Sequence, residues 1–184
     1  MEPRALKDDA YIPGYESLHR AAAFRTLAQR RRGYALPVVE PLGDSRRRRG
    51  YLGNTGIKVS GLCFGALPLG PLQANISVPR GAAIIKHALD RGINFIDTAQ
   101  LYKTYPHIRR ALLEHRGNVV VSSKTYAATY EGMNEAIQEA IAGMAIDHLD
   151  IMFLHGARVP LTVLTDRREA LRYLADAKRE GLIR

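Results

Sequence analysis

The chain has 184 residues, of which 46% are hydrophobic and 24% charged, values that are ordinary for a soluble globular domain with a core of its own. The single cysteine, Cys63, excludes an intrachain disulfide and a cysteine-rich metal site, and we expect no metal site of another kind. No apolar run reaches the roughly 18 residues that a membrane-spanning helix needs, and no signal-peptide pattern opens the sequence. These features predict a cytoplasmic protein that does not enter membranes.

The net charge of +9 is unevenly distributed. Residues 1–50 carry 11 Lys and Arg against 6 Asp and Glu, a net charge of +5, and two arginine runs, Arg30–Arg32 and Arg46–Arg49, supply the excess. Such runs can bind nucleic-acid phosphates, but no zinc spacing, helix-turn-helix signature or aromatic stacking pattern accompanies them. A mitochondrial presequence would also be Arg-rich, but it would be poor in acidic residues, whereas this segment has six. We expect residues 1–50 to form a basic, poorly ordered extension and residues 51–184 to form the folded domain.

The first regular elements begin at Tyr51. Residues 51–60 hold two strand-like pieces around the turn signal Asn-Thr-Gly, which predicts a hairpin. Residues 62–67 form a short apolar strand, in which Cys63 is expected to be buried, and a loop rich in glycine and proline follows. Pro79 begins a predicted helix that ends at Gly92. The predicted apolar face of this helix carries four side chains: Ile84, Ile85, Ala88 and Leu89.

Strands and helices then alternate to the end of the sequence. Predicted strands at 93–99, 119–125 and 149–155 alternate with predicted helices at 107–115, 131–145 and 166–180. This alternation is typical of right-handed crossovers and a parallel sheet with helices outside it. The strands are near-continuous apolar runs, as expected for parallel strands that are buried on both faces. The sequence therefore predicts an α/β fold.

Ionisable residues follow three of the predicted strands at the point where each strand ends. Asp97 follows INFI, Lys124 follows VVVSS, and His155 follows DIMFL, at spacings of 27 and 31 residues. Neighbouring parallel strands lie ~4.8 Å apart, so these side chains would form a row along the carboxyl edge of the sheet, where α/β folds place their active sites. Tyr102 lies in the loop after the first of these strands and can fold back over the row. We therefore predict that these four residues form an active site.

Four segments resemble, in this order, the N-terminal half of an aldo-keto reductase: LGNTGIKVSGLCFGALPLG, GINFIDTAQLYKTYPHIRRALLE, VVVSSKT and AIDHLDIMFLH. The resemblance covers residues 51–184, and its most specific motif is Asp-Thr-Ala-x-x-Tyr. It implies a (β/α)8 TIM barrel, of which this chain holds the N-terminal hairpin and about four βα units. The loop Leu67–Gln73 and the stretch Thr104–His107 resemble, in addition, a branch of the family that carries an iron–sulfur segment near its C-terminus.

The resemblance also implies an activity, the NAD(P)H-dependent reduction of an aldehyde or ketone to an alcohol. The family's tetrad of Asp, Tyr, Lys and His maps onto Asp97, Tyr102, Lys124 and His155. A free tyrosine titrates near ~10, and a nearby ammonium group favours its phenolate. Tyr102 would thus donate the proton with Lys124 beside it, Asp97 would pair with the lysine, and His155 would hydrogen-bond the carbonyl oxygen of the substrate.

The cofactor and the extent of the fold follow from the same resemblance. Gly65, Ala66 and Leu67, together with Asp97, would line the nicotinamide end of the cofactor, and the family favours NADPH over NADH. A full barrel typically takes ~250 residues. We therefore expect the 184-residue chain to be truncated, to lack cofactor-binding groups of the second half, to be inactive alone, and to self-associate through open barrel edges.

Two other functions remain open on the sequence alone. Lys124 could form a Schiff base with a carbonyl substrate, as strand-end lysines do in aldolases, although that chemistry gives Asp97 and Tyr102 no role. Alternatively, the chain could be a non-catalytic half-barrel that associates with partners, or an Arg-rich module that binds nucleic acid. Borohydride trapping would support the first of these, and salt-dependent DNA retention would support the nucleic-acid module.

Overall fold

The computed structural model describes residues 49–115, 117–156 and 165–184. The predicted extension 1–50 therefore lies outside the described residues except for Arg49 and Gly50. These two residues begin β1 (Arg49–Tyr51), which pairs antiparallel with β2 (Lys58–Ser60). The loop between the strands contains Gly53 and Gly56 at φ of +53° and +71°, a region that glycine adopts readily. The predicted hairpin is thus present.

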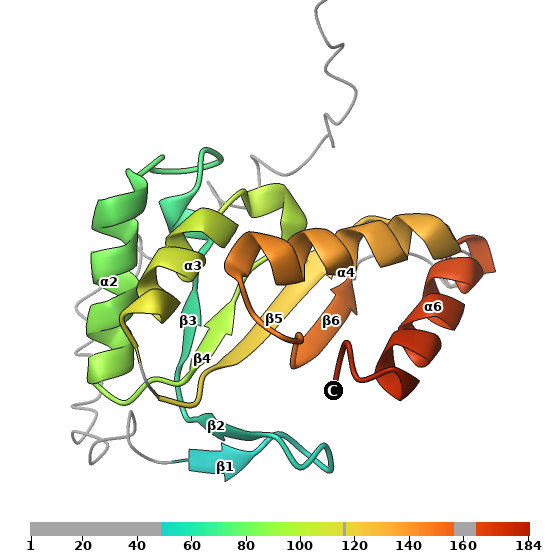
Figure 1. Ribbon diagram of the computed structural model, residues 1–184, viewed down its shortest axis with the longest axis horizontal. Coiled ribbons are helices and arrows are strands. Elements are labelled where there is room, and N and C mark those ends of the chain that lie inside the picture. The colour runs from blue at the N-terminus through green and yellow to red at the C-terminus, as the bar shows by residue number, and fades with distance from the viewer. Residues whose placement is uncertain (1–48, 116, 157–164) are drawn as a thin grey trace, which may run out of the picture. The chain divides into compact units, whose positions relative to one another are not determined.

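Four parallel strands form the main sheet in the order β3–β4–β5–β6 (Figure 1). Their bounds are Cys63–Gly65 for β3, Phe95–Asp97 for β4, Val120–Thr125 for β5 and Ile151–Leu154 for β6. Among the residues that the structure describes, four helices follow these strands in turn: α2 (Val78–Asp90), α3 (Tyr105–Leu113), α4 (Tyr130–Met144) and α6 (Arg168–Arg179). Two single turns of 3₁₀ helix, η1 (Leu67–Leu69) and η2 (Gln100–Tyr102), lie in the loops after β3 and β4. The predicted α/β fold with a parallel sheet is confirmed.

The helices begin and end near the predicted residues for local reasons. Pro79 occupies the first turn of α2, where its missing N–H costs no hydrogen bond, and Gly92 just beyond the helix has φ of +94°. The Thr129 side chain accepts a hydrogen bond from the Gly132 N–H at 3.0 Å and so caps α4. The predicted apolar face of α2 is buried only in part. Ile85 and Leu89 are buried in α2, whereas Ile84, one step of about 100° around the helix, is 39% exposed.

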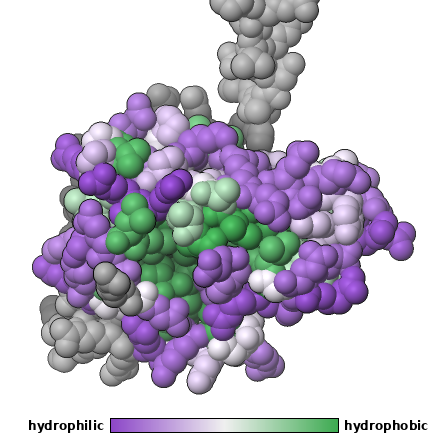
Figure 2. All heavy atoms as spheres, viewed as in Figure 1, coloured by the Kyte–Doolittle hydropathy of each residue, from purple (hydrophilic) through white to green (hydrophobic). Residues whose placement is uncertain are grey.

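The main hydrophobic core lies between the four helices and one face of the sheet. Ile96 and Val121 project into it from β4 and β5, and Ile85, Ile108 and Ile137 meet them from the helices. On the side of the molecule shown in Figure 2, hydrophilic residues surround a group of apolar side chains in the centre of the view. The sheet is thus fixed on its helical side by close packing.

The opposite face of the sheet is covered at its amino end by the hairpin. Ile57 and Val59 pack against Val120, and the backbone of Ser60 donates to the Asn94 side chain at 2.6 Å. Farther along this face the described residues leave side chains open to solvent, among them Phe153 at 46% exposure. Cys63, at the start of β3 on the edge of the described sheet, was expected to be buried, but it is exposed.

The last residues of the chain lie beside the start of β6. Ile183 forms a parallel bridge with Leu149, and the Leu149 N–H donates to the Leu182 carbonyl at 3.0 Å. The side chain of Asp150, which is 6% exposed, accepts hydrogen bonds from the Val121 N–H and from Arg184, both at 2.8 Å. Asp150 therefore joins β5 to the C-terminal residues rather than capping an element.

Candidate active site

A lysine–aspartate pair joins the carboxyl ends of β4 and β5. The Lys124 ammonium donates to Oδ2 of Asp97 at 2.7 Å and to the carbonyl of Thr98 at 2.6 Å. Ser122 is the β5 partner of Asp97 in the ladder, and its hydroxyl donates to Oδ1 of Asp97 at 2.7 Å. Ser122 and Lys124 are two residues apart and so share one face of the strand. The side chains of Lys124 and Asp97 are 19% and 31% exposed, which leaves the pair accessible from one side.

Tyr102 ends the η2 turn directly beside this pair. The Lys124 ammonium lies 4.9 Å from the centroid of its ring, within the range of a cation–π contact. The hydroxyls of Thr98 and Thr104, both fully buried, lie 2.7 Å apart and close the loop on either side of η2. A Cβ on Gly70 would overlap the carbonyl oxygen of Tyr102, so the loop after β3 packs directly against this turn.

His155 follows β6 and faces Tyr102 from the other side of the row. Its N–H donates to the Thr125 carbonyl at 2.8 Å, which continues the ladder between β5 and β6. Its ring meets the Tyr102 ring edge-on at 5.7 Å between centroids and stacks on the Tyr126 ring at 4.4 Å. Burial, and next the charge of Lys124, lowers the pKa of His155 below its ordinary value of 6.5. The imidazole is therefore neutral at neutral pH.

The structure brings the four predicted residues together at one edge of the sheet. The predicted cofactor-binding residues differ in how far they are exposed. Gly65 pairs with Asp97, is exposed, and has no atom within 4 Å of the place where a Cβ would lie. Ala66 is fully buried in the core and reaches the site only through its N–H, which donates to the Asp97 carbonyl at 2.8 Å. Leu67 is half-buried at the start of η1.

Three residues of the site were not predicted from the sequence. Strand alternation places Ser122 on the same face as Lys124, and this signal was available in VVVSSKT. Tyr126 directly follows the strand end and could have been considered for the same reason. Arg167, which binds the carbonyls of Thr125, Ala127 and His155, has no comparable signal, because backbone carbonyls leave no pattern in a sequence.

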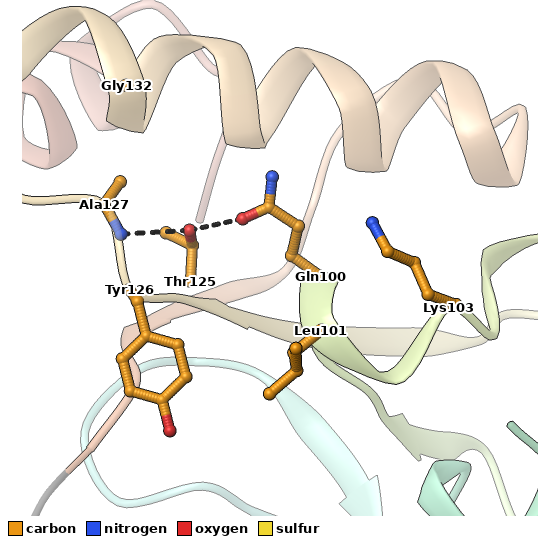
Figure 3. A pocket seen from close by; sticks show the side chains of 7 residues that line it. All are labelled: Gln100, Leu101, Lys103, Thr125, Tyr126, Ala127 and Gly132. Atoms are coloured by element: carbon orange, nitrogen blue, oxygen red, sulfur yellow. Dashed lines mark hydrogen bonds between the residues drawn. The ribbon is translucent and has the colours of Figure 1, made fainter. Parts of the chain in front are cut away.

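A cavity of about 300 Å³ lies between η2, the end of β5 and the start of α4 (Figure 3). In it, the Thr125 hydroxyl donates to the Gln100 side chain at 2.6 Å. Leu101 and Tyr126, which are 47% and 51% exposed, provide apolar surface. The cavity is lined by Gln100, Leu101, Lys103, Thr125, Tyr126, Ala127 and Gly132. Tyr126, whose ring stacks on His155, is thus the side chain that connects this cavity to the row.

Within the described ranges, no three His, Cys, Asp or Glu side chains are placed to hold a metal ion. No helix of that same part of the chain is long and apolar enough to cross a membrane. The row itself supplies a phenol hydroxyl, one ion pair and one imidazole.

Comparison with known proteins identifies the family. The model of the aldo/keto reductase family matches residues 61–184. The chain belongs to this family. All four residues of the row lie inside the matched range, so the row is located in the part of the chain that defines the aldo/keto reductase relationship.

Curated relatives match the chain over part of their length. L-galactose dehydrogenase of Arabidopsis thaliana is 31% identical over 116 residues, which are 56% of this chain and 36% of that protein. The 6-dehydroglucose reductase of Novosphingobium aromaticivorans is 27% identical over 72% of this chain and 48% of its own length. The chain thus spans about a third to a half of the length of these relatives.

Solved aldo-keto reductase structures agree with the fold. A Pseudomonas aeruginosa protein described as an aldo-keto reductase has a TM-score of 0.65 and 27% identity, covering 76% of this chain and 58% of that chain. An aldo-keto reductase of Bombyx mori, solved in complex with NADP, has a TM-score of 0.57 and 20% identity, covering 71% of this chain and 46% of that chain. These matches support the barrel fold and give no support to the predicted iron–sulfur branch.

Proposed function

We propose that the protein to which these residues belong reduces an aldehyde or ketone to an alcohol, with a nicotinamide cofactor and with Tyr102 as the proton donor. The observation that carries this proposal is the position of the Lys124 ammonium, 2.7 Å from Asp97 and 4.9 Å from the centre of the Tyr102 ring. A cation at this distance stabilises the phenolate that remains after tyrosine has given up its proton. The family relationship supports the same reaction class.

The roles of the other residues follow from their contacts. Asp97 balances the charge of Lys124, so that the half-buried ammonium is not left unpaired. Ser122 holds the second oxygen of Asp97 and so fixes the carboxylate plane. His155 is neutral at neutral pH because burial lowers its pKa, and a neutral imidazole carries one N–H that can donate to the carbonyl oxygen of a substrate. A donor at this place would stabilise the negative charge that develops on that oxygen.

The residues present fit the reactive end of a nicotinamide cofactor. The space above Gly65 is open where a side chain would otherwise stand, and the carboxylate of Asp97 lies at the paired position of the next strand. Gly65, the backbone of Ala66, Leu67 and Asp97 would hold the nicotinamide ring. When bound, the cofactor would supply the hydride for the carbonyl carbon. We favour NADPH over NADH, because the Bombyx mori member of the family was solved with NADP.

The substrate in this proposal is a small carbonyl compound. Its reacting oxygen would accept hydrogen bonds from the Tyr102 hydroxyl and from a ring N–H of His155, two side chains whose ring centroids lie 5.7 Å apart. The remainder of the molecule could reach the cavity beside Tyr126 and Leu101, where the wall is apolar.

The Schiff-base alternative is less well supported by the contacts of Lys124. Its nitrogen donates to Asp97 and to the Thr98 carbonyl at 2.7 and 2.6 Å, so the two groups that hold it are both hydrogen-bond acceptors. A Schiff base requires the free amine to attack a carbonyl carbon. This arrangement suits an ammonium that stays in place better than an amine that reacts.

The test is an assay of NADPH oxidation with a nitrobenzaldehyde. It is run on the 184-residue chain and, in parallel, on any longer product of the same gene. In a preparation that turns over, Tyr102→Phe should lower kcat by roughly 10²–10⁴ with little change in cofactor affinity. Tyr51→Phe, in the exposed hairpin, is the matched control. Full turnover by the Phe variant would refute Tyr102 as the acid, and trapping of substrate on Lys124 by borohydride would favour the Schiff base.

A further inference from the structure

Arg167 is a nearly buried arginine directly before α6, and the tetrad chemistry assigns it no role. Only 7% of the residue is exposed. Its backbone carbonyl accepts the Leu171 N–H at 3.1 Å and so belongs to the start of α6. That helix is in turn tied to α4, where the Tyr130 hydroxyl donates to Asp176 at 2.8 Å. The base of the Arg167 side chain is therefore anchored in the helical layer.

The guanidinium of Arg167 reaches from this anchor to the carboxyl ends of two strands. Nη2 donates to the Thr125 carbonyl at 2.7 Å and to the Ala127 carbonyl at 3.0 Å, and Nε donates to the same Ala127 carbonyl at 3.1 Å. Nη1 donates to the His155 carbonyl at 2.7 Å. A planar fork with five N–H donors can serve three carbonyls at once, which the single ammonium of a lysine does less well.

These carbonyls belong to the residues that carry the site. Thr125 directly follows Lys124, and its carbonyl also accepts the His155 N–H at 2.8 Å. Ala127 follows Tyr126, whose ring stacks on His155 at 4.4 Å. The guanidinium thus connects the end of β5, the segment that carries Tyr126, and His155 through its hydrogen bonds. Movement of either strand end would lengthen at least one of these charge-assisted hydrogen bonds.

We propose that Arg167 is a positioning residue of the active site, whose guanidinium joins the ends of β5 and β6 and holds His155 at its distance from Lys124 and Tyr102. The catalytic part of this role rests on the proposed function, but the joining of the two strand ends does not. Displacing an oriented group by about 1 Å can cost about 10²-fold in rate. We therefore expect loss of the fork to lower kcat by about 10- to 100-fold while cofactor affinity stays unchanged.

The experiment compares Arg167→Lys, which keeps the charge, and Arg167→Gln, which keeps a planar amide with two donors. Arg168→Lys and Arg168→Gln, at the neighbouring exposed arginine, are the matched controls. The readout is the NMR signal of the His155 ring in histidine-labelled protein, assigned by its absence in His155→Gln. We expect both Arg167 variants to shift this signal and to change its titration, whereas the Arg168 variants leave it unchanged.

Several charged groups affect the pKa of His155, so the two Arg167 variants are expected to differ in their titration. Lys124 from β5, Asp97 from β4 and Arg167 from the start of α6 all act on the charge of His155. Arg167→Gln removes one positive charge near the ring, so the pKa of His155 should move up toward its ordinary value. Arg167→Lys retains that charge, so a changed ring signal in this variant reports displacement rather than lost charge.

The outcomes separate the two proposals. A shifted His155 signal in the Arg167 variants of a protein that reduces no carbonyl compound would support the positioning role and count against the proposed function. An unchanged His155 signal in Arg167→Lys would overturn the positioning role, even if the variant were less stable. Failure of both Arg167 variants to fold, with normal Arg168 controls, would also overturn it, because Arg167 would then be a residue of general stability.

Discussion

The ammonium of Lys124 and the carboxylate of Asp97 lie 2.7 Å apart on neighbouring strands, and both side chains are partly open to solvent. Ser122 occupies the other carboxylate oxygen, and the Thr98 carbonyl accepts a second hydrogen bond from the lysine. The pair is therefore held by two further groups, and its geometry does not depend on the charges alone. We therefore expect removal of Asp97 and removal of Lys124 to lower the stability of the fold by different amounts.

Asp97→Asn should be the more destabilising change of the two. It leaves the Lys124 ammonium, 19% exposed, without a counter-charge, and we expect a loss of about 1–2 kcal/mol in the free energy of unfolding. Lys124→Met removes the charge that needs a partner, and Ser122 still serves Asp97, so the loss should be smaller. Urea denaturation of both variants and of the double variant measures the coupling. Lys86→Met, in the exposed pair with Asp90, should leave the midpoint unchanged.

The stability of the fold should depend on pH through His155. Because burial lowers its pKa in the folded state, the unfolded chain binds the proton more readily between the lowered value and 6.5. Stability is therefore fully present above about pH 6.5 and is lost as the pH falls through the lower, folded-state value. Urea midpoints measured on either side of this window should show the loss, and His155→Gln should reduce it. An equal loss in His155→Gln would assign the effect to other groups, and His87→Gln in α2 serves as the control.

The buried hydroxyls of Thr98 and Thr104 should behave as one unit. Thr98→Val or Thr104→Val leaves the other hydroxyl buried without its 2.7 Å partner, at a cost of about 1–3 kcal/mol. The double variant removes both polar groups, so its cost should be clearly less than the sum of the two. Chemical denaturation of the three variants tests this, and additive losses would show that the hydroxyls act separately.

Gly70→Ala should displace the turn that carries Tyr102. The added Cβ would overlap the Tyr102 carbonyl oxygen, which is backbone and cannot rotate away. We expect about 1–3 kcal/mol of lost stability and a lower kcat in any active preparation. Gly50→Ala, where a Cβ meets no atom within 4 Å, is the control for the general effect of the substitution. Unchanged stability in Gly70→Ala would show that the two loops separate easily.

The order of elements and the row of site residues were predictable because both depend on local patterns. Apolar runs that end in Asp97, Lys124 and His155 mark parallel strands, and the spacing of about one βαβ unit makes them neighbours. The exposure of Cys63 was not predictable in this way, because it depends on what covers the second face of the sheet.

The residues that position the site could not be predicted from the sequence as its four ionisable residues could. Arg167 acts on carbonyls up to 42 positions away, and Gly70 matters only because the Tyr102 backbone passes close to it. Both contacts are made to backbone atoms, which every residue type has, so no spacing or motif in the sequence indicates them. Ser122 is the intermediate case, since strand alternation indicates its face but not its partner.

The strand that carries Lys124 has a neighbour on each side, whereas β3 and β6 are edges among the described strands. Amide protons on β5 should therefore exchange with solvent only when the whole domain opens, while those of η2 can exchange through local fluctuation of a single turn. Lys124 and Tyr102 would then differ in kinetic terms. The cation would be fixed on the slowest-exchanging part of the sheet, and the movement of the phenol would be limited by the contacts of its turn with Gly70 and by the Thr98–Thr104 hydrogen bond.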